Sequence, residues 1–99
     1  MSPELKQTIV ETLKELNPKE IAVFGSYARG EETPDSDIDI LISYADPVDF
    51  FQIVGAIRQL EDKIHIKVDL VSKSAASQKF LSSIETDLIY LLNDVKRSA

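Results

Sequence analysis

The chain has no cysteine, a single histidine and no long apolar run. Without thiols it can form neither disulfides nor thiolate zinc sites, and a reducing interior suits it. No stretch approaches the length of a membrane span, and the polar start Met1–Glu4 is unlike a signal peptide. We therefore expect a cytoplasmic protein with no membrane partner.

Clusters of basic residues are also missing. The formal net charge is −6, from 17 acidic and 11 basic residues, and the basic ones are scattered along the chain. An acidic surface repels nucleic acid, which disfavours direct nucleic-acid binding and a stand-alone polymerase. A basic protein partner, or a triphosphate neutralised by metal, fits this charge better.

The length of 99 residues fits one domain spanning residues 1–99, and an apolar content of 43% suffices for one compact core. A core of this size gives limited stability, which favours association with a partner.

Apolar periodicity predicts alternating helices and strands. A first helix follows the capping residue Ser2 and ends before Asn17-Pro18, because its apolar residues recur at spacings of four, four and three: Leu5, Ile9, Leu13 and Leu16. Residues 20–24 read as a buried strand, and the alternation in 38–43 and 64–71 predicts two more.

The remaining segments predict further helices. Asp46-Pro47 is expected to open a helix, with Asp46 as the cap and a buried stripe made of Phe50, Phe51, Val54, Ile57 and Leu60. Residues 74–83 read as another helix. Residues 84–95 fit a helix, but 88–92 also fit a buried strand, and periodicity does not decide between the two. The pattern indicates an α/β fold, a small mixed sheet with helices packed on it.

The run Gly25–Gly30, Gly-Ser-Tyr-Ala-Arg-Gly, has the features of a phosphate-binding turn. Gly25 lacks a Cβ, so the backbone can turn sharply and approach a phosphate. Ser26 stands at the start of an expected short helix, where its hydroxyl and the exposed N–H groups can hold phosphate oxygens. Arg29, three residues on, suits a phosphate or a neighbouring carboxylate.

Three acidic residues are placed for metal binding. Asp37 and Asp39 lie two apart at the start of a strand, so their carboxylates share one face. Asp69 lies inside a later strand, where an acid is costly unless it is paired, bound to metal or directed into a cleft. If these strands are neighbours, the carboxylates can hold two Mg²⁺ ions, and Asp69 can help to deprotonate an acceptor hydroxyl.

Each feature also has a simpler interpretation. A Gly-Ser turn is common, an Asp-x-Asp pair is usually a solvated loop or a cap, and Asp69 could pair with Lys67. His65 is better read as a partly exposed strand residue than as a base. The order and spacing of all the elements together favour the site for nucleotide and metal.

Three segments carry a resemblance to a known family: Gly25–Gly30, Ser36–Ile40 and Val68–Val71. Together they are similar to the signature of the polymerase-beta-type nucleotidyltransferase superfamily, in the form typical of its minimal nucleotidyltransferase branch. Residues 84–90 resemble the segment that closes the domain in this branch, which is a strand there. The helical second domain of larger relatives is missing.

The resemblance implies a polymerase-beta-like fold and transfer of AMP from ATP, with Mg²⁺, releasing pyrophosphate. By position, Gly25, Ser26 and Arg29 would bind the nucleotide, and Asp37, Asp39 and Asp69 would ligate metal and carry the catalysis. Proteins of this branch are often antitoxins paired with a HEPN-type toxin, on which they adenylylate a tyrosine hydroxyl. The resemblance thus implies a hetero-oligomer with such a toxin.

Two alternatives stay open. The chain could neutralise a partner by occlusion, without catalysis, or it could transfer the nucleotide to a small molecule.

Overall fold

A four-stranded mixed sheet forms the centre of the computed structural model, which describes residues 1–93. Its strands are β1 (Pro18–Phe24), β2 (Ile38–Tyr44), β3 (Val68–Ser72) and β4 (Ile89–Asn93), in the order β3-β2-β1-β4. β1 is antiparallel to β2 and β4, whereas β2 and β3 are parallel. The prediction of a small mixed sheet with packed helices is confirmed.

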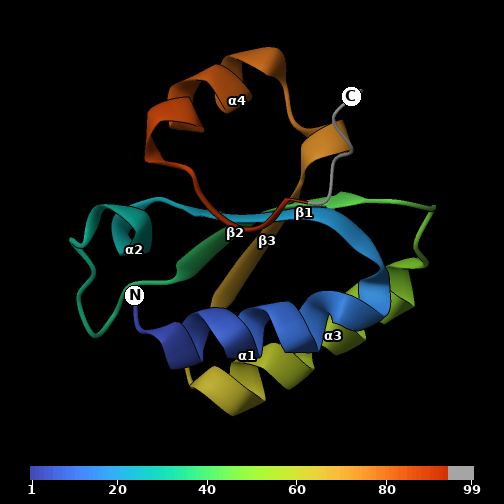
Figure 1. Ribbon diagram of the computed structural model, residues 1–99, viewed down its shortest axis with the longest axis horizontal. Coiled ribbons are helices and arrows are strands. Elements are labelled where there is room, and N and C mark those ends of the chain that lie inside the picture. The colour runs from blue at the N-terminus through green and yellow to red at the C-terminus, as the bar shows by residue number, and fades with distance from the viewer. Residues whose placement is uncertain (94–99) are drawn as a thin grey trace.

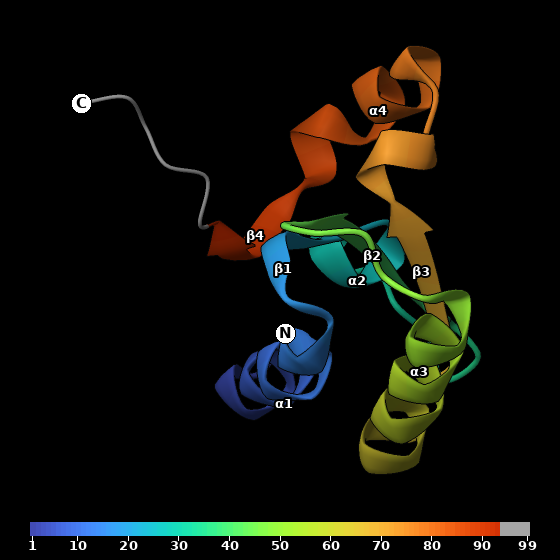
Figure 2. The same cartoon turned by 90° about the vertical axis from the view of Figure 1, so that its right-hand side faces the viewer.

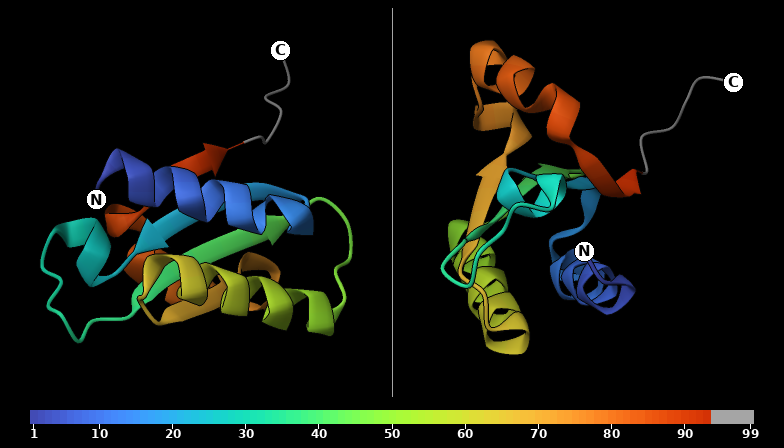
Figure 3. Two further views of the ribbon diagram at one scale, coloured as in Figure 1. Left: turned by 90° about the horizontal axis from the view of Figure 1, so that it is seen from below. Right: turned by 90° about the vertical axis from the view of Figure 1, so that its left-hand side faces the viewer.

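The helices cover both faces of this sheet. α1 (Pro3–Leu13) and α3 (Phe50–Ile64) lie on one face, and α4 (Gln78–Ile84) arches over the other (Figures 1 and 2). α1 and α3 run side by side beneath the sheet (Figure 3), where Lys63 of α3 donates to the buried Thr12 hydroxyl of α1 at 3.3 Å. The short α2 (Ser26–Arg29) follows β1 at the end of the sheet. None of the helices described in residues 1–93 has the length and apolar character needed to span a membrane.

Two apolar clusters fill the spaces between these layers. The larger lies between the sheet and α1 with α3, and its buried members include Ile9, Leu13, Ile21, Val23, Ile38, Ile40, Ile42 and Leu60. The smaller lies under α4 and joins Ala22, Phe24, Leu41 and Ile84. There Phe80 packs its ring edge-on against Phe24, with centroids 5.7 Å apart. Alternate residues of β1 and β2 therefore serve different cores.

The first helix follows its sequence signals. The Ser2 side chain accepts a hydrogen bond from the Leu5 N–H at 3.1 Å, which caps α1. A 3₁₀ turn, η1 (Lys14–Leu16), continues the helix, and Asn17 ends it in the left-handed conformation with φ 52°.

The start and the buried face of α3 differ from the prediction. Asp49, not Asp46, is the cap; its backbone N–H donates to the Gln52 side chain, while Asp46 accepts a hydrogen bond from Asn17. Phe50, Phe51 and Val54 are 68%, 78% and 36% exposed, so they form no buried stripe. The buried face is centred on Ala56 and Leu60. Contact with α1 and the sheet selects this face, although the run of apolar residues is wider.

The observed strand β3 begins later than the alternating pattern in residues 64–71 predicts. Ile64 is the last residue of α3, and His65 caps the helix with φ 58° while its N–H donates to the Glu61 carbonyl at 2.8 Å. The strand β3 begins only at Val68, whose N–H donates to the Glu61 side chain. His65 is exposed, as expected, but it lies in a helix cap and not in a strand.

The C-terminal part resolves an ambiguity. The predicted helix 74–83 divides into a 3₁₀ turn, η2 (Lys73–Ala75), and α4, which Ser77 caps. After another 3₁₀ turn, η3 (Glu85–Asp87), the strand β4 pairs with β1, so the strand interpretation of 88–92 is the correct one. Val95, part of the helical alternative, lies outside the described residues.

Substitutions on α3 test which of its faces carries the stability. Leu60→Ala removes a fully buried side chain and is expected to lower the free energy of unfolding by about 2–5 kcal/mol. Phe51→Ala removes a larger but exposed side chain and should change it by less than about 0.5 kcal/mol. Urea unfolding of both variants measures the difference, and an equal loss in both would contradict the buried face described here.

Candidate active site

The parallel pairing of β2 with β3 brings two of the predicted acids together. In this register Asp39 lies directly opposite Asp69, between the pairs Ile38–Val68 and Ile40–Leu70. The flanking apolar residues point into the larger core, so the two aspartates face the opposite side of the sheet. Asp39 is half-buried and Asp69, on the edge strand, is exposed. The expectation that these strands are neighbours is confirmed.

Asp39 is the electrostatic centre of this group. Its partial burial raises its pKa above the ordinary value, and the negative charges of Asp69 and Asp37 raise it further. A hydrogen bond between the Asp39 and Asp69 carboxyl groups acts in the same direction, while the positive charge of Arg29 lowers this pKa. Arg29 therefore compensates the charge of the ionised Asp39 only in part, and a bound divalent metal would supply further positive charge.

The acids by themselves form an incomplete metal site, which a bound nucleotide would complete. Asp37 is exposed just before β2, and its charge reaches Asp39. Within residues 1–93, no three His, Cys, Asp or Glu side chains are grouped so that they could hold a metal ion, so the expected convergence of three carboxylates is not observed. The pairing of β2 with β3 brings two of them, Asp39 and Asp69, opposite each other. Mg²⁺ commonly binds through one or two carboxylates and completes its shell with water and substrate phosphates. Carboxylates that are open to a substrate therefore fit Mg²⁺ better than they fit an ion that needs a full set of protein ligands.

The glycine turn packs directly against this cluster. Gly25 connects β1 to α2 with φ 76° and ψ −154°, a conformation largely restricted to glycine. A Cβ at Gly25 would overlap with the Oδ2 atom of Asp39. The backbone before Ser26 therefore lies against the carboxylate, and the first N–H groups of α2 begin there. The turn predicted to bind phosphate and the carboxylate of Asp39, predicted to bind metal, are thus adjacent in space.

Arg29 has two carboxylate partners. Its Nε donates to Oε1 of Glu31 and its Nη1 to Oδ2 of Asp87, each at 2.9 Å. Glu31, in the exposed loop after α2, is therefore an ion-pair partner of Arg29. Asp87 is a residue that the sequence analysis missed, and no local pattern could have found it because it lies 58 positions from Arg29.

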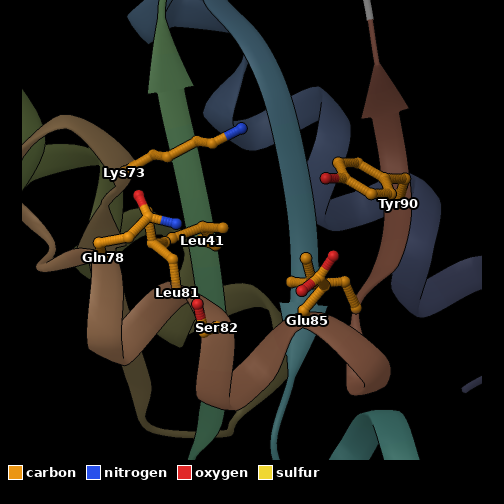
Figure 4. Close-up of a pocket in the computed structure, with 8 residues that line it drawn as sticks. Leu41, Lys73, Gln78, Leu81, Ser82, Glu85 and Tyr90 are labelled. Carbon is orange, nitrogen blue, oxygen red and sulfur yellow. The ribbon is translucent and has the colours of Figure 1, made fainter.

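A separate hollow lies on the same face of the sheet. It has a volume of about 280 Å³ and lies between α4 and the strands (Figure 4), lined by Leu41, Lys73, Gln78, Leu81, Ser82, Glu85, Leu88 and Tyr90. Lys73 in its wall is paired with Glu20 of β1 at 3.1 Å. None of the predicted site residues lines this hollow, so the carboxylates and the glycine turn form a distinct site.

Comparisons with known proteins show which family the chain belongs to. Residues 6–91 match the family model described as "Nucleotidyltransferase domain". The chain belongs to the nucleotidyltransferase domain family.

Relatives of this nucleotidyltransferase domain carry a narrower name. It is 32% identical to the protein adenylyltransferase MntA of Thermococcus cleftensis, over 89% of this chain and 93% of that protein. It is 43% identical to MJ0126 of Methanocaldococcus jannaschii, provisionally named a protein adenylyltransferase, over 89% of this chain and 95% of that protein.

Solved structures agree with these relatives. One chain of a toxin–antitoxin crystal structure with AMP-PNP matches the nucleotidyltransferase domain with a TM-score of 0.79 and 28% identity, covering 89% of this chain and 73% of that one. A complex of a tri-AMPylated Shewanella oneidensis HEPN toxin with an MNT antitoxin matches with a TM-score of 0.74 and 25% identity, covering 94% and 73%. The resemblance to the minimal nucleotidyltransferase branch is confirmed.

The three glycines of this nucleotidyltransferase domain provide a graded test of the turn. Gly25→Ala should cost about 2 kcal/mol or more, because it adds backbone strain and an overlap with Asp39. Gly30→Ala, with φ 72° but open space around its Cβ, should cost about 1 kcal/mol. Gly55→Ala, inside α3 with no atom nearby, should stabilise by up to about 1 kcal/mol. Urea unfolding measures all three, and equal losses at Gly25 and Gly30 would exclude the contact with Asp39.

The raised pKa of Asp39 predicts a pH-dependent stability. Below the ordinary carboxyl pKa, Asp39 is protonated in both the folded and unfolded states and costs nothing. As the pH rises from there through the raised pKa, ionisation costs folding free energy. Asp39→Asn should therefore raise the melting temperature of the free protein by a few degrees at neutral pH, and the gain should vanish below about pH 3.5.

Asp35→Asn serves as the control for this experiment, because it removes the same charge from an exposed position of the neighbouring loop. Equal gains in melting temperature from both variants would show that only net charge, and not the environment of Asp39, is involved.

Proposed function

We propose that this chain is a Mg²⁺-dependent protein adenylyltransferase of the cytoplasm. It transfers AMP from ATP to a tyrosine hydroxyl of a HEPN-type toxin and acts as the antitoxin in a hetero-oligomer with it. The observation that carries this proposal is the pairing of Asp39 with Asp69 beside the Gly25 turn. The names of the relatives and of the matching complexes support the choice of acceptor.

Each group has a role in this reaction. Asp37, Asp39 and Asp69 would hold Mg²⁺, which neutralises the charge of the triphosphate and polarises it. Gly25 lets the backbone approach the phosphates, and Ser26 offers its hydroxyl and N–H groups at the start of α2. Arg29, next to this turn, contributes positive charge.

The transfer itself requires one proton acceptor. The tyrosine oxygen attacks the α-phosphorus, the bond from that phosphorus to the bridging oxygen breaks, and pyrophosphate leaves. Asp69 is exposed at the edge of the sheet, so an approaching hydroxyl can reach it, and it takes the phenolic proton. Asp37, Asp39 and Asp69 would hold two metal ions once a nucleotide is bound, and these ions would neutralise the triphosphate and activate the attacking hydroxyl.

A partner of this kind also suits the charge and the size of the molecule. The net charge of −6 disfavours nucleic acid as a direct partner and is compatible with a basic protein. The matching structures include toxin–antitoxin complexes, one of them with an AMPylated toxin. A protein acceptor is therefore favoured over a small molecule.

Mass spectrometry of the partner tests the proposal. The protein encoded by the neighbouring gene is incubated with the chain, ATP and Mg²⁺, and its intact mass should rise by whole AMP units if it is the toxin. The double variant Asp37→Ala/Asp39→Ala should lower the rate by more than about 100-fold, since removing metal ligands should exceed the 10–100-fold typical of losing an outer-shell partner of a metal.

Two controls separate transfer from simple binding. Chelation with EDTA should abolish the mass gain, and excess Mg²⁺ should restore it. Asp35→Ala, which removes an acid from the same exposed loop, should transfer AMP normally. A stable complex in which the toxin is silenced without any mass gain would reject the transferase and favour neutralisation by occlusion.

A further inference from the structure

The side chain of Arg29 is held on two sides by carboxylates. Glu31 lies two residues away in the exposed loop after α2, and its side chain is 66% exposed. Asp87 comes from the turn η3, immediately before the edge strand β4, and its side chain is only 25% exposed. Asp87 is thus the more sheltered of the two partners, and its bond is the one that ties α2 to a distant part of the chain.

These bonds fix the direction of the guanidinium group. The group is planar and its N–H donors have a fixed fork geometry, so two bonds to different nitrogens determine the orientation of the whole plane. The remaining N–H groups are then left for a further acceptor. The side chain stays close enough to the carboxylate cluster for its charge to act on Asp39.

The anchor of Asp87 is itself well supported by the fold. η3 follows α4, whose residues Ile84 and Phe80 pack on the sheet through the smaller apolar cluster. It precedes β4, which pairs with β1, the strand that leads directly into Gly25. Both ends of the Arg29–Asp87 bond are therefore attached to β1, and the bond closes a short structural loop around the glycine turn.

We propose that Asp87 is a positioning residue of the nucleotide site: its ion pair holds the guanidinium of Arg29 beside the glycine turn, with donors directed to a triphosphate. This inference rests on the proposed function, in which Arg29 lies beside the bound nucleotide. It assigns a role to a residue of the turn η3, outside the sequence motif.

If Asp87 competed with a phosphate for Arg29, the opposite effect on nucleotide binding would be expected. If Asp87 merely occupied Arg29 until a phosphate displaced it, removing the carboxylate would strengthen nucleotide binding. Loss of a negative charge near a triphosphate would also strengthen binding by charge alone. Positioning is the only one of these effects that makes binding weaker when Asp87 is neutralised, so the direction of the change decides.

Calorimetric titration of the full chain with AMP-PNP and Mg²⁺ provides the test. Asp87→Asn keeps the shape of the side chain and removes the charge, and it should raise the Kd about fivefold, the upper range for a partly exposed ion pair. Glu85→Gln is the matched control, because it neutralises an exposed acid of the same turn that has no bond to Arg29 among the described contacts. It should leave the Kd unchanged or lower it.

Further measurements separate positioning from a general loss of structure. The melting temperature of Asp87→Asn should stay close to that of the wild type, and in the transfer reaction KM for ATP should rise while kcat changes little. Asp87→Glu retains the charge with a longer side chain, so its Kd should lie between those of the wild type and Asp87→Asn. This variant also provides the answer if Asp87→Asn does not fold.

The outcomes distinguish this inference from the proposed function. Wild-type chain that binds AMP-PNP, with an Asp87→Asn variant that binds it equally or more tightly, would overturn the role of Asp87 and leave the transferase intact. Failure of the wild type itself to bind AMP-PNP with Mg²⁺ would overturn both.

Discussion

The parallel register between β2 and β3 is the constraint on which the site depends. Asp39 lies opposite Asp69 only because Ile38 and Ile40 fit the core on the other face of the sheet. A shift of β2 by one residue would turn these isoleucines toward α4 and bury the Asp39 carboxylate under α1 and α3, at a prohibitive cost. The packing of the larger core therefore fixes the positions of Asp39 and Asp69, the proposed catalytic acids, although it contains neither of them.

This arrangement places acids of like charge together in a partly buried position. The raised pKa of Asp39 reports the cost, which arises first from burial and then from its acidic neighbours. The fold tolerates the cost because Asp69 and Asp37 remain exposed to water and because the aliphatic core on the other face of the sheet supplies stability. A cation bound by these carboxylates would remove the repulsion, so the unfavourable energy of the free protein becomes affinity for metal and nucleotide. At Asp39, the negative charge that would favour cation binding therefore lowers the stability of the free protein.

The two faces of the sheet differ: one carries the main core, and the other carries the candidate site. The face under α1 and α3 is closed by fully buried aliphatic residues and provides the stability. The other face carries only a small apolar cluster under α4, and the carboxylates and the glycine turn lie at its open end. The ion pair from Arg29 to Asp87 connects these open-face elements across 58 residues of sequence. In so small a domain, such a connection can orient a side chain for which the core has no room.

Local interactions explain which features were predictable. The cap of α1 at Ser2, the alternation in β2 and the glycine turn depend on neighbours within a few residues, and the structure agrees with each of these predictions. The family motif determined the candidate acids for the same reason, because their order and spacing are local properties of the chain. Asp39 and Asp69 required one further step, the assumption that their strands are neighbours, which the pairing confirms.

Other features depended on contacts that no local pattern contains. The apolar residues at the start of α3 outnumber the positions on one helix face, and only packing against α1 and the sheet selects Ala56 and Leu60 over Phe50 and Phe51. The alternation before β3 continues through a helix end, where His65 adopts a left-handed cap. The sequence by itself thus determined the chemistry of the site and most of the elements that carry it. Only the tertiary structure decided the face of α3, the strand at 89–93 and the partner of Arg29, because burial and long-range pairing depend on which distant segments meet.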